Sequence, residues 1–447
     1  MDFQRTRTGG GSAGWAGNRL SDAAKSTSRN SSSREQPRPG LQRQTLRTSE
    51  PARKHRPDYW LLILSVALLS VGLIVVYAIS PALGIAHHVS DNFYISRQLI
   101  AIALGGVAFF VASKVPIATW RRFCLPLLGL AAAATLLALV MPVNTQYPAH
   151  RWIRLGSFSF QSVELLKFAL LIWLAGVLAD RIKEGTITNF KRTLKPIAFA
   201  FLVVGFVVAG VQSDLGSMAV ITAMMALMVF VAGLPMKRLL IFGVVIALLG
   251  VLAVSTTPYR RERLATFLHP TADCQSSGYQ ACQALISVGS GGVVGLGLGR
   301  SVQAYGYLPE AANDSIFAIY AEKFGFVGVA VLLALFAAFF ARLKRLAERA
   351  PDDTSRFIVI GILAWLATQT MINVGAMLGL LPLKGITLPL VSYGGTSVVF
   401  IMAALGVVFH ISKYASHTLP GDDTTPVRSS QALNRASLER RRGGQTV

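Results

Sequence analysis

The chain has 447 residues, of which 53% are hydrophobic and only 14% are charged, and its mean hydropathy is +0.51. Soluble domains carry about 25% charged residues, so this composition excludes an ordinary soluble protein and predicts an all-α polytopic membrane protein. Much of the formal net charge of +22 lies in tails and short loops, where Lys and Arg meet anionic lipid and set membrane orientation. We therefore expect anionic lipid, and no nucleic acid, as a partner.

Both ends of the chain are polar. Residues 1–57 are rich in Ser, Arg, Gly, Gln and Pro, and through Asp58 the chain carries twelve Lys and Arg against five Asp and Glu, a net charge of +7. This segment has too long a positive region for a signal peptide and no short apolar core that ends in a cleavage site. Residues 1–57 and 414–447 are therefore predicted to be disordered tails.

Residues 58–413 are predicted to form a transmembrane domain. A helix of about 20 apolar residues crosses a bilayer, and the chain contains ten candidate stretches. They are 59–80, 97–113, 123–142, 163–179, 196–212, 216–234, 238–256, 315–341, 357–380 and 393–412.

The orientation follows from the basic residues of the loops. They gather in alternate connections, at 114–122, 181–195, 237–238 and 342–356. Cytoplasmic loops are enriched in Lys and Arg, and these connections lie on the side of the basic N-terminal tail. Both termini are therefore predicted to be cytoplasmic. The long loop 257–314, before the eighth helix, is then extracytoplasmic, and loops of this length usually carry a site.

A Gly-rich stretch, 289–299, lies inside this long loop. Its spacing matches neither the dinucleotide-binding G-x-G-x-x-G motif nor a P-loop, which argues against a nucleotide site. Gly291, Gly295 and Gly299 recur every four residues, a spacing that lets a helix pack closely. We expect a re-entrant or surface-lying segment here.

The three cysteines do not make a disulfide framework, and no pair of Cys or His has zinc-ligand spacing. Cys274 and Cys282 share the long loop and can form a disulfide if the exterior is oxidising. On one helix they would be about 12 Å apart, at 1.5 Å per residue, and both would stay free thiols. Because there is no metal-ligand motif, the cofactor stays unknown, and a divalent cation remains an open alternative.

The long loop ends in the stretch 307–325, where a polar loop becomes an apolar helix and contains two carboxylates, Glu310 and Asp314. If the turn is helical, these two residues share a face, and Asn313 or Asp314 can cap the next helix. An acid at a membrane entrance is partly desolvated, which makes it a better proton acceptor. The stretch alone favours a helix cap over a catalytic base, but the other charged residues reverse that preference.

Further charged residues lie at the outer ends of the predicted spans. Glu164 and Lys167 fall on one helical face, which suits an ion pair and equally a contact with substrate. Arg151 and Arg154 can hold a phosphate between them or simply contact lipid headgroups. Lys384 is another outward cation. Together these residues surround an apolar scaffold with charge, which suits a lipid that carries phosphate and sugar.

Asp214 lies in a tight outer turn before the sixth predicted helix and is expected to cap that helix. The segment around Pro389 and Gly394-Gly395 precedes the last predicted helix. Lipid does not tolerate irregular backbone, so this segment is expected to be buried in protein or to line a cavity.

Eight groups of motifs carry a family resemblance, which extends from about residue 59 to 413. On these motifs the chain resembles the SEDS family (shape, elongation, division and sporulation), typified by FtsW and RodA. The motifs are Arg151-Trp152-Ile153 with Leu155-Gly156, Gln161, Glu164-Leu165 and Lys167; Asp214-Leu215-Gly216; Pro258-Tyr259-Arg260 with Arg263; Gly278-Tyr279-Gln280 and Gln283; Gly297-Leu298-Gly299 with Ser301 and Gln303; Leu308-Pro309-Glu310-Ala311 with Asp314, Ile316-Phe317-Ala318-Ile319 and Glu322; Asn373-Val374-Gly375; and Lys384-Gly385-Ile386-Thr387-Leu388-Pro389 through Ser392-Tyr393-Gly394-Gly395.

The resemblance implies a peptidoglycan glycosyltransferase that polymerises lipid II on the outer face of the bacterial cytoplasmic membrane. It implies a class B penicillin-binding protein, a transpeptidase, as partner, together with other divisome or elongasome membrane proteins. Asp314 corresponds to the catalytic acid of the family, and its implied role is to take a proton from the acceptor sugar's 4-hydroxyl. The substrate-binding residues that the motifs imply are Arg151, Glu164, Lys167, Gln280, Gln283, Glu310, Lys384 and Ser392.

Residues 77–80 and 307–311 look more like the division branch of the family, which places the protein at the division septum. Some positions depart from the family pattern. Ala312 stands where a His is usual, which puts in doubt any mechanism that needs that His. The usual acidic pair becomes Glu322-Lys323, and the long loop lacks the usual Trp after Phe267.

Two other functions fit the same features. A transporter that carries lipid II across the bilayer would also need charged residues in a cavity between helices. A non-catalytic scaffold for the transpeptidase would need only the fold. The position of the carboxylate at the outer mouth favours the polymerase, because the acceptor hydroxyl is on that side.

Overall fold

The structure is a computed structural model that describes residues 56–141, 152–155, 158–255, 261, 265–268, 274–276 and 278–415. All of these belong to one compact unit, Pro51–Val447. Arg151 and nearly all of both predicted tails lie outside the described residues, so the predictions about them remain predictions.

The described chain is mainly helical, as predicted. Each of the ten predicted spans overlaps a helix. The elements are α1 (Tyr59–Ala86), α2 (Phe93–Ala112), α3 (Ile117–Arg122), α4 (Cys124–Val140), β1 (Trp152–Leu155), β2 (Phe158–Gln161), α5 (Ser162–Lys183), the π-helix η1 (Phe190–Leu194), α6 (Lys195–Gly205), the π-helix η2 (Phe206–Val211), α7 (Leu215–Val231), α8 (Met236–Ser255), α10 (Tyr279–Ser290), α11 (Ile316–Glu348), α12 (Asp353–Met377) and α13 (Gly395–Ser412).

Seven helical segments among the described residues are long and apolar enough to cross a membrane: α1, α2, α5, the continuous stretch Phe190–Val211, α11, α12 and α13. The apolar helices α4 and α7 are shorter. These helices make the protein a multi-pass membrane protein. The number of ten spans and the cytoplasmic position of both termini stay predictions.

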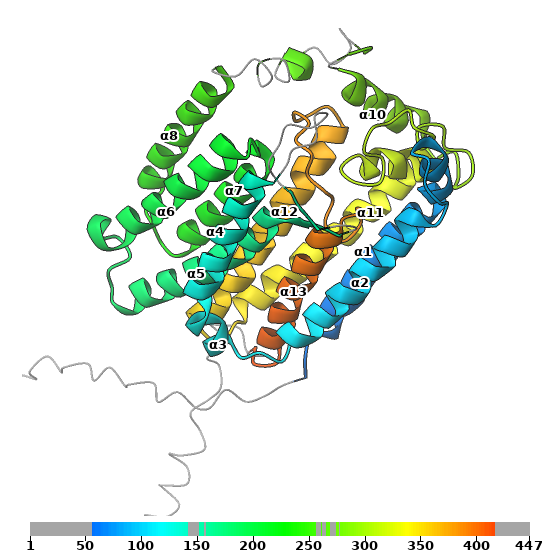
Figure 1. Cartoon of the computed structure of the whole chain (residues 1–447). Helices are drawn as coiled ribbons and strands as arrows, with labels where there is room; N and C mark the ends of the chain where they lie inside the picture. The colour runs from blue at the N-terminus through cyan, green and yellow to red at the C-terminus, as the bar shows by residue number, and fades with distance from the viewer. Residues whose placement is uncertain are drawn as a thin grey trace, which may run out of the picture. The chain divides into compact units, whose positions relative to one another are not determined.

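The core of the unit is formed by α5 and α12, which are buried over most of their length. Figure 1 shows α5 and α12 among the other helices, with α1 and α2 on one side and α6 and α8 on the other. Gly361 lets α12 approach its neighbours, because a Cβ there would come within 2.9 Å of Leu171 on α5 and 2.8 Å of Met228 on α7. By contrast, α6 and α8 expose large apolar residues such as Phe199 and Leu248, as lipid-facing helices do.

A short antiparallel hairpin, β1 and β2, precedes α5 and was not expected from the sequence. Trp152 pairs with Gln161 and Leu155 pairs with Phe158. The hairpin is tied to the start of α13, because the Thr396 hydroxyl donates to the carbonyl of Ser159 at 3.0 Å. This contact fixes the point at which α5 enters the bundle.

The long loop contains a disulfide between Cys274 and Cys282, as the sequence allowed. Cys274 lies in a turn before α10 and only Cys282 is helical, so their Cα atoms are 5.6 Å apart instead of two helical turns. The helical alternative, in which both stay free thiols, is therefore wrong.

Candidate active site

Asp314 lies in a turn directly before α11 and is 8% exposed. The helix begins at Ile316, and its N-cap residue is Ser315. The sequence allowed Asn313 or Asp314 as the cap of this helix, and neither is the N-cap residue. The carboxylate of Asp314 is therefore one residue before the N-cap position of α11.

The backbone that carries Asp314 is held by three successive hydrogen bonds. The carbonyls of residues 312–314 accept, in order, from the backbone N–H of Tyr393 at 2.9 Å, the hydroxyl of Ser392 at 2.6 Å and the side-chain amide of Asn373 at 2.7 Å. Two donors lie just before α13 and the third is on α12. The turn is thereby fixed to two other parts of the fold, and fixed backbone limits where the carboxylate can point.

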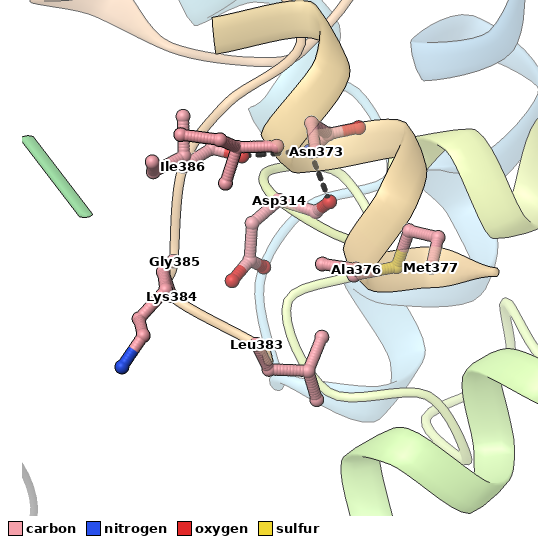
Figure 2. A pocket seen from close by; sticks show the side chains of 9 residues that line it. Asp314, Asn373, Ala376, Met377, Leu383, Lys384, Gly385 and Ile386 are labelled. Carbon is pink, nitrogen blue, oxygen red and sulfur yellow. Dashed lines mark hydrogen bonds between the residues drawn. The ribbon is translucent and has the colours of Figure 1, made fainter. Parts of the chain in front are cut away.

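A small pocket lies beside this turn, with a volume of about 10 Å³, which is room for one water molecule. In Figure 2 the carboxylate of Asp314 points toward the segment at Lys384 and Gly385, while the ammonium of Lys384 points away from it. A whole sugar cannot enter a pocket of this size, so a hydroxyl group would have to reach Asp314 from the mouth. The lining residues are Asp314, Ile372, Asn373, Ala376, Met377, Leu383, Lys384, Gly385 and Ile386.

The segment that carries Lys384 is itself held in place. Asn373 donates a second hydrogen bond, of 2.6 Å, to the carbonyl of Ile386. On its other side, the segment of Lys384 packs against the start of α7, where a Cβ at Gly216 would come within 3.0 Å of Lys384 Cβ. Lys384 is half-buried, so its position beside the pocket is set by α7 and α12 together.

Glu310 does not share a helical face with Asp314, contrary to the expectation for a helical turn. It has a φ of 52° in a non-helical turn, and its side chain is exposed. The side-chain amide of Asn313 donates a hydrogen bond to the Glu310 carboxylate. A left-handed conformation is uncommon in a residue other than Gly, Asn or Asp, and such residues gather at functional sites.

Glu164 and Lys167 form the predicted ion pair, with 2.8 Å between Lys167 Nζ and Glu164 Oε1 and side chains at most 5% exposed. Lys167 Nζ also donates to Gln369 Oε1 at 3.2 Å and lies 4.8 Å from the centre of the Trp365 ring. The amide of Gln369 donates onward to the carbonyl of Thr387 at 3.0 Å. The pair is therefore connected to the segment that carries Lys384, while a contact of the pair with substrate stays a prediction.

The other predicted site residues are placed as follows. Gln280 on α10 donates to the hydroxyl of Ser315, next to Asp314, at 3.2 Å. Gln283 is on the same helix and is partly exposed. Ser392 is 2% exposed and uses its hydroxyl to hold Asn313 and to accept from the N–H of Leu388 at 2.7 Å.

Asp214 caps α7, as predicted. Its carboxylate accepts from the backbone N–H of Ser217 at 3.0 Å and from the hydroxyl of Ser217 at 2.8 Å.

The sequence analysis did not place Asn373 in the site. A polar side chain inside a membrane span is costly unless it forms hydrogen bonds or serves a function. The position of Asn373 inside a predicted span was therefore a signal that could have identified it.

Glu322 on α11 is also buried, at 1% exposed, but it does not line the pocket beside Asp314. Its carboxylate accepts hydrogen bonds from the hydroxyl of Ser301 at 2.5 Å and from the N–H of Val302 at 2.8 Å.

Within the described part of the chain, no group of three or more His, Cys, Asp or Glu side chains could hold a metal ion. The structure therefore names no ligands for a divalent cation.

Known proteins are similar to this chain over most of its length. Residues 59–417 match the family model FTSW_RODA_SPOVE, described as "Cell cycle protein". The chain is 37% identical over 368 residues to "Stage V sporulation protein E" of Bacillus subtilis, covering 82% of this chain and 99% of that protein. It is 38% identical over 366 residues to "Probable peptidoglycan glycosyltransferase FtsW" of Saccharophagus degradans, covering 80% and 92%.

Two solved structures are also similar. One is titled "Structural coordination of polymerization and crosslinking by a peptidoglycan synthase complex", with a TM-score of 0.66, 30% identity and coverage of 80% of this chain and 97% of that one. The other is the rod shape determining protein RodA of Thermus thermophilus, with a TM-score of 0.59, 28% identity and coverage of 81% and 98%. The chain belongs to the FtsW/RodA/SpoVE family, the SEDS proteins.

Proposed function

We propose that this protein is a peptidoglycan glycosyltransferase that polymerises lipid II into glycan strands during cell division. Several relatives that are 35–38% identical carry the name "Probable peptidoglycan glycosyltransferase FtsW". The observation that carries the proposal is Asp314: a nearly buried carboxylate at a small pocket, outside the N-cap position, on backbone held by three hydrogen bonds.

In the proposed reaction Asp314 is the general base. It accepts the proton of the 4-hydroxyl of the acceptor N-acetylglucosamine, whose oxygen attacks the anomeric carbon of the donor sugar. The bond from that carbon to undecaprenyl pyrophosphate breaks, and the pyrophosphate leaves with the electron pair. The small pocket excludes all but the reacting group, so the base and the hydroxyl meet in a defined geometry.

The leaving pyrophosphate needs cations to balance its charge. Lys384 is suitably placed, because it is half-buried beside the pocket and its ammonium points outward. Arg151, just before β1, is a second candidate. Lys167 is bound to Glu164 and acts through Gln369 on the segment of Lys384. The remaining proposed substrate contacts are Gln280, Gln283, Glu310 and Ser392.

The proposed setting is the division septum of the bacterial cytoplasmic membrane, with both termini cytoplasmic and the loop 257–314 outside. The proposed partner is a class B penicillin-binding protein, which would cross-link the strands that this chain polymerises. One similar structure is a peptidoglycan synthase complex, described in its title as coordinating polymerization and crosslinking.

The test is the substitution Asp314→Asn, assayed with purified protein, partner transpeptidase and labelled lipid II, with the glycan products separated on a gel. An amide cannot accept the proton, and general-base catalysis is worth about 10²–10⁴-fold in rate, so we expect almost no product. The matched control is Asp352→Asn. Asp352 caps α12 by accepting from the N–H of Ser355 at 2.9 Å, and Asn caps about equally well, so this variant should keep its activity.

Full polymerisation by a well-folded Asp314→Asn protein would refute the mechanism. The transporter would then become the leading alternative, because a charged pair inside a membrane helix also occurs along transport paths. Movement of labelled lipid II across vesicles by the purified protein would separate the transporter from the scaffold.

A further inference from the structure

The segment that follows α10 is not helical, yet its peptide groups are paired with α11. The helix α11 is interrupted at Gly325, which has φ 63° and ψ −166°. The interruption leaves carbonyl and N–H groups of α11 without partners in the helix. Peptide groups of the segment 292–297 form hydrogen bonds with them instead. The four bonds are Leu296 N–H to Glu322 O at 2.9 Å, Gly297 N–H to Lys323 O at 3.0 Å, Phe326 N–H to Gly292 O at 2.9 Å and Val327 N–H to Val293 O at 3.0 Å.

Glycines permit this close approach. A Cβ at Gly291 would come 2.1 Å from the carbonyl oxygen of Ala321, and one at Gly295 would come 2.2 Å from that of Lys323. Two of the three glycines spaced by four residues, Gly291 and Gly295, therefore pack closely, whereas a Cβ at Gly299 would meet no atom within 4 Å. The packing is made by a non-helical segment, because α10 ends at Ser290.

Side chains satisfy further polar groups of the segment. Lys323 Nζ donates to the carbonyl of Leu298 at 2.7 Å. The carboxylate of Glu322 accepts from the N–H groups of Val302 and Gln303 at 2.8 and 3.3 Å. Part of the backbone of residues 291–298 is thus hydrogen-bonded within the protein.

The outward side of the segment is apolar. Val293 is 67% exposed, Val294 is 78% exposed and Leu298 is 46% exposed. Water disfavours such a row of exposed apolar side chains on an irregular segment. A bilayer accepts it only where the backbone polar groups are satisfied inside the protein, and the bonds to α11 meet part of that condition.

The tip of the segment also completes an open apolar groove of about 610 Å³ with α1 and α2. Because α1 and α2 are membrane spans, the exposed face of the segment continues their lipid-facing surface. In Figure 1 the yellow-green segment after α10 lies beside the end of α1. The groove is lined by Leu73, Ile74, Tyr77, Ala78, Ile95, Leu99, Leu298 and Gly299.

We propose that residues 291–299 are immersed in the hydrocarbon layer of the membrane and that the groove holds an acyl chain of a bilayer phospholipid. The loop that leads to Asp314 is then anchored in the lipid on one side and in the interruption of α11 on the other. This inference does not depend on the catalytic role of Asp314.

The test measures the surroundings of single fluorescent labels. Cys124 is the free cysteine of the described residues, so Cys124→Ala with the native disulfide kept provides the background. Val294→Cys and Leu298→Cys are labelled with a small environment-sensitive dye, and the full chain is reconstituted in phosphatidylcholine vesicles that contain phospholipid with a spin label on its acyl chain. The matched control is Ser276→Cys, in the exposed turn beside Cys274.

We expect the spin-labelled phospholipid to quench the dyes at 294 and 298 several-fold more than the dye at 276, and aqueous iodide to do the reverse. Ala78→Phe should fill the groove and reduce lipid quenching at 298, while quenching at 294 stays unchanged. Glycan polymerisation and the thermal midpoint of each variant establish that it is folded.

Iodide quenching at 294 and 298 equal to that at 276 would place the segment in water and overturn the proposal. Loss of lipid quenching at 294 on addition of the partner transpeptidase would assign this face to a protein instead. Recovery of fluorescence at 298 on addition of polyprenyl phosphate would show that the groove takes an isoprenoid chain, which would overturn the phospholipid assignment.

Discussion

Asn373 and Asp314 are joined by a hydrogen bond of 2.7 Å from the side-chain amide of the first to the main-chain carbonyl of the second. The same amide nitrogen donates to the carbonyl of Ile386 at 2.6 Å. One buried side chain thus connects the turn of the proposed base to the segment of Lys384, which lines the same pocket. The orientation of the proposed catalytic carboxylate therefore depends on a residue that is remote in sequence.

Asn373→Asp is expected to slow polymerisation with little change in the KM for lipid II. The size of the side chain is kept, but a carboxylate cannot donate to the two carbonyls, and each buried group left without a partner costs about 1–3 kcal/mol. The measurements are initial rates of glycan synthesis and the thermal midpoint in detergent. Ser65→Ala, which removes a hydroxyl bonded within α1 to Leu61 O, is the control, and an equal loss of rate in it would contradict the positioning role.

Lys167→Met is expected to lower the free energy of unfolding by about 3–5 kcal/mol, because it leaves the Glu164 charge buried without its partner. The double variant with Glu164→Gln removes both charges and should recover much of that loss. Chemical unfolding of the wild type, Lys167→Met, Glu164→Gln and the double variant gives the coupling energy between the two side chains. If the double variant is stable but has a much higher KM for lipid II, the pair also contacts substrate. If the losses of unfolding free energy in the two single variants add up to the loss in the double variant, the two side chains are not coupled.

Gly325→Ala is expected to destabilise the protein by at least about 1–3 kcal/mol, since a residue with a side chain is strained at φ 63° and ψ −166°. A Cβ at this position would also lie 2.3 Å from Gly295 N. The thermal midpoint is the measurement. The control is Gly289→Ala in α10, where a Cβ meets no atom within 4 Å and a gain of about 0.5–1 kcal/mol is expected.

Ser276→Cys is expected to react with an impermeant maleimide in intact cells, and Arg356→Cys is not. Ser276 lies in the long loop and is exposed, while Arg356 is exposed near the start of α12, in a basic connection. Both variants are made with Cys124→Ala. Labelling at 356 in intact cells, with none at 276, would reverse the orientation predicted for the whole chain.

Much of the architecture was determined by the sequence alone. Long apolar stretches bounded by charged or Gly-containing connections have few alternatives to membrane helices, because a backbone in lipid must satisfy its own hydrogen bonds. The ion pair of Glu164 and Lys167 and the cap at Asp214 were also predictable, since both arise from positions close together along one helix. Such contacts between residues three apart can be predicted from the helical repeat alone.

The tertiary structure decided what the local pattern could not. The sequence allowed Asp314 to be a helix cap, and only the position of Ser315 at the start of α11 excluded this. It could not place Asn373 against Asp314, because 59 residues separate them and the contact depends on how α12 packs. It likewise marked the glycines of 291–299 as a packing site but not their partner, since the hydrogen bonds to the backbone beside Gly325 join segments that are about thirty residues apart.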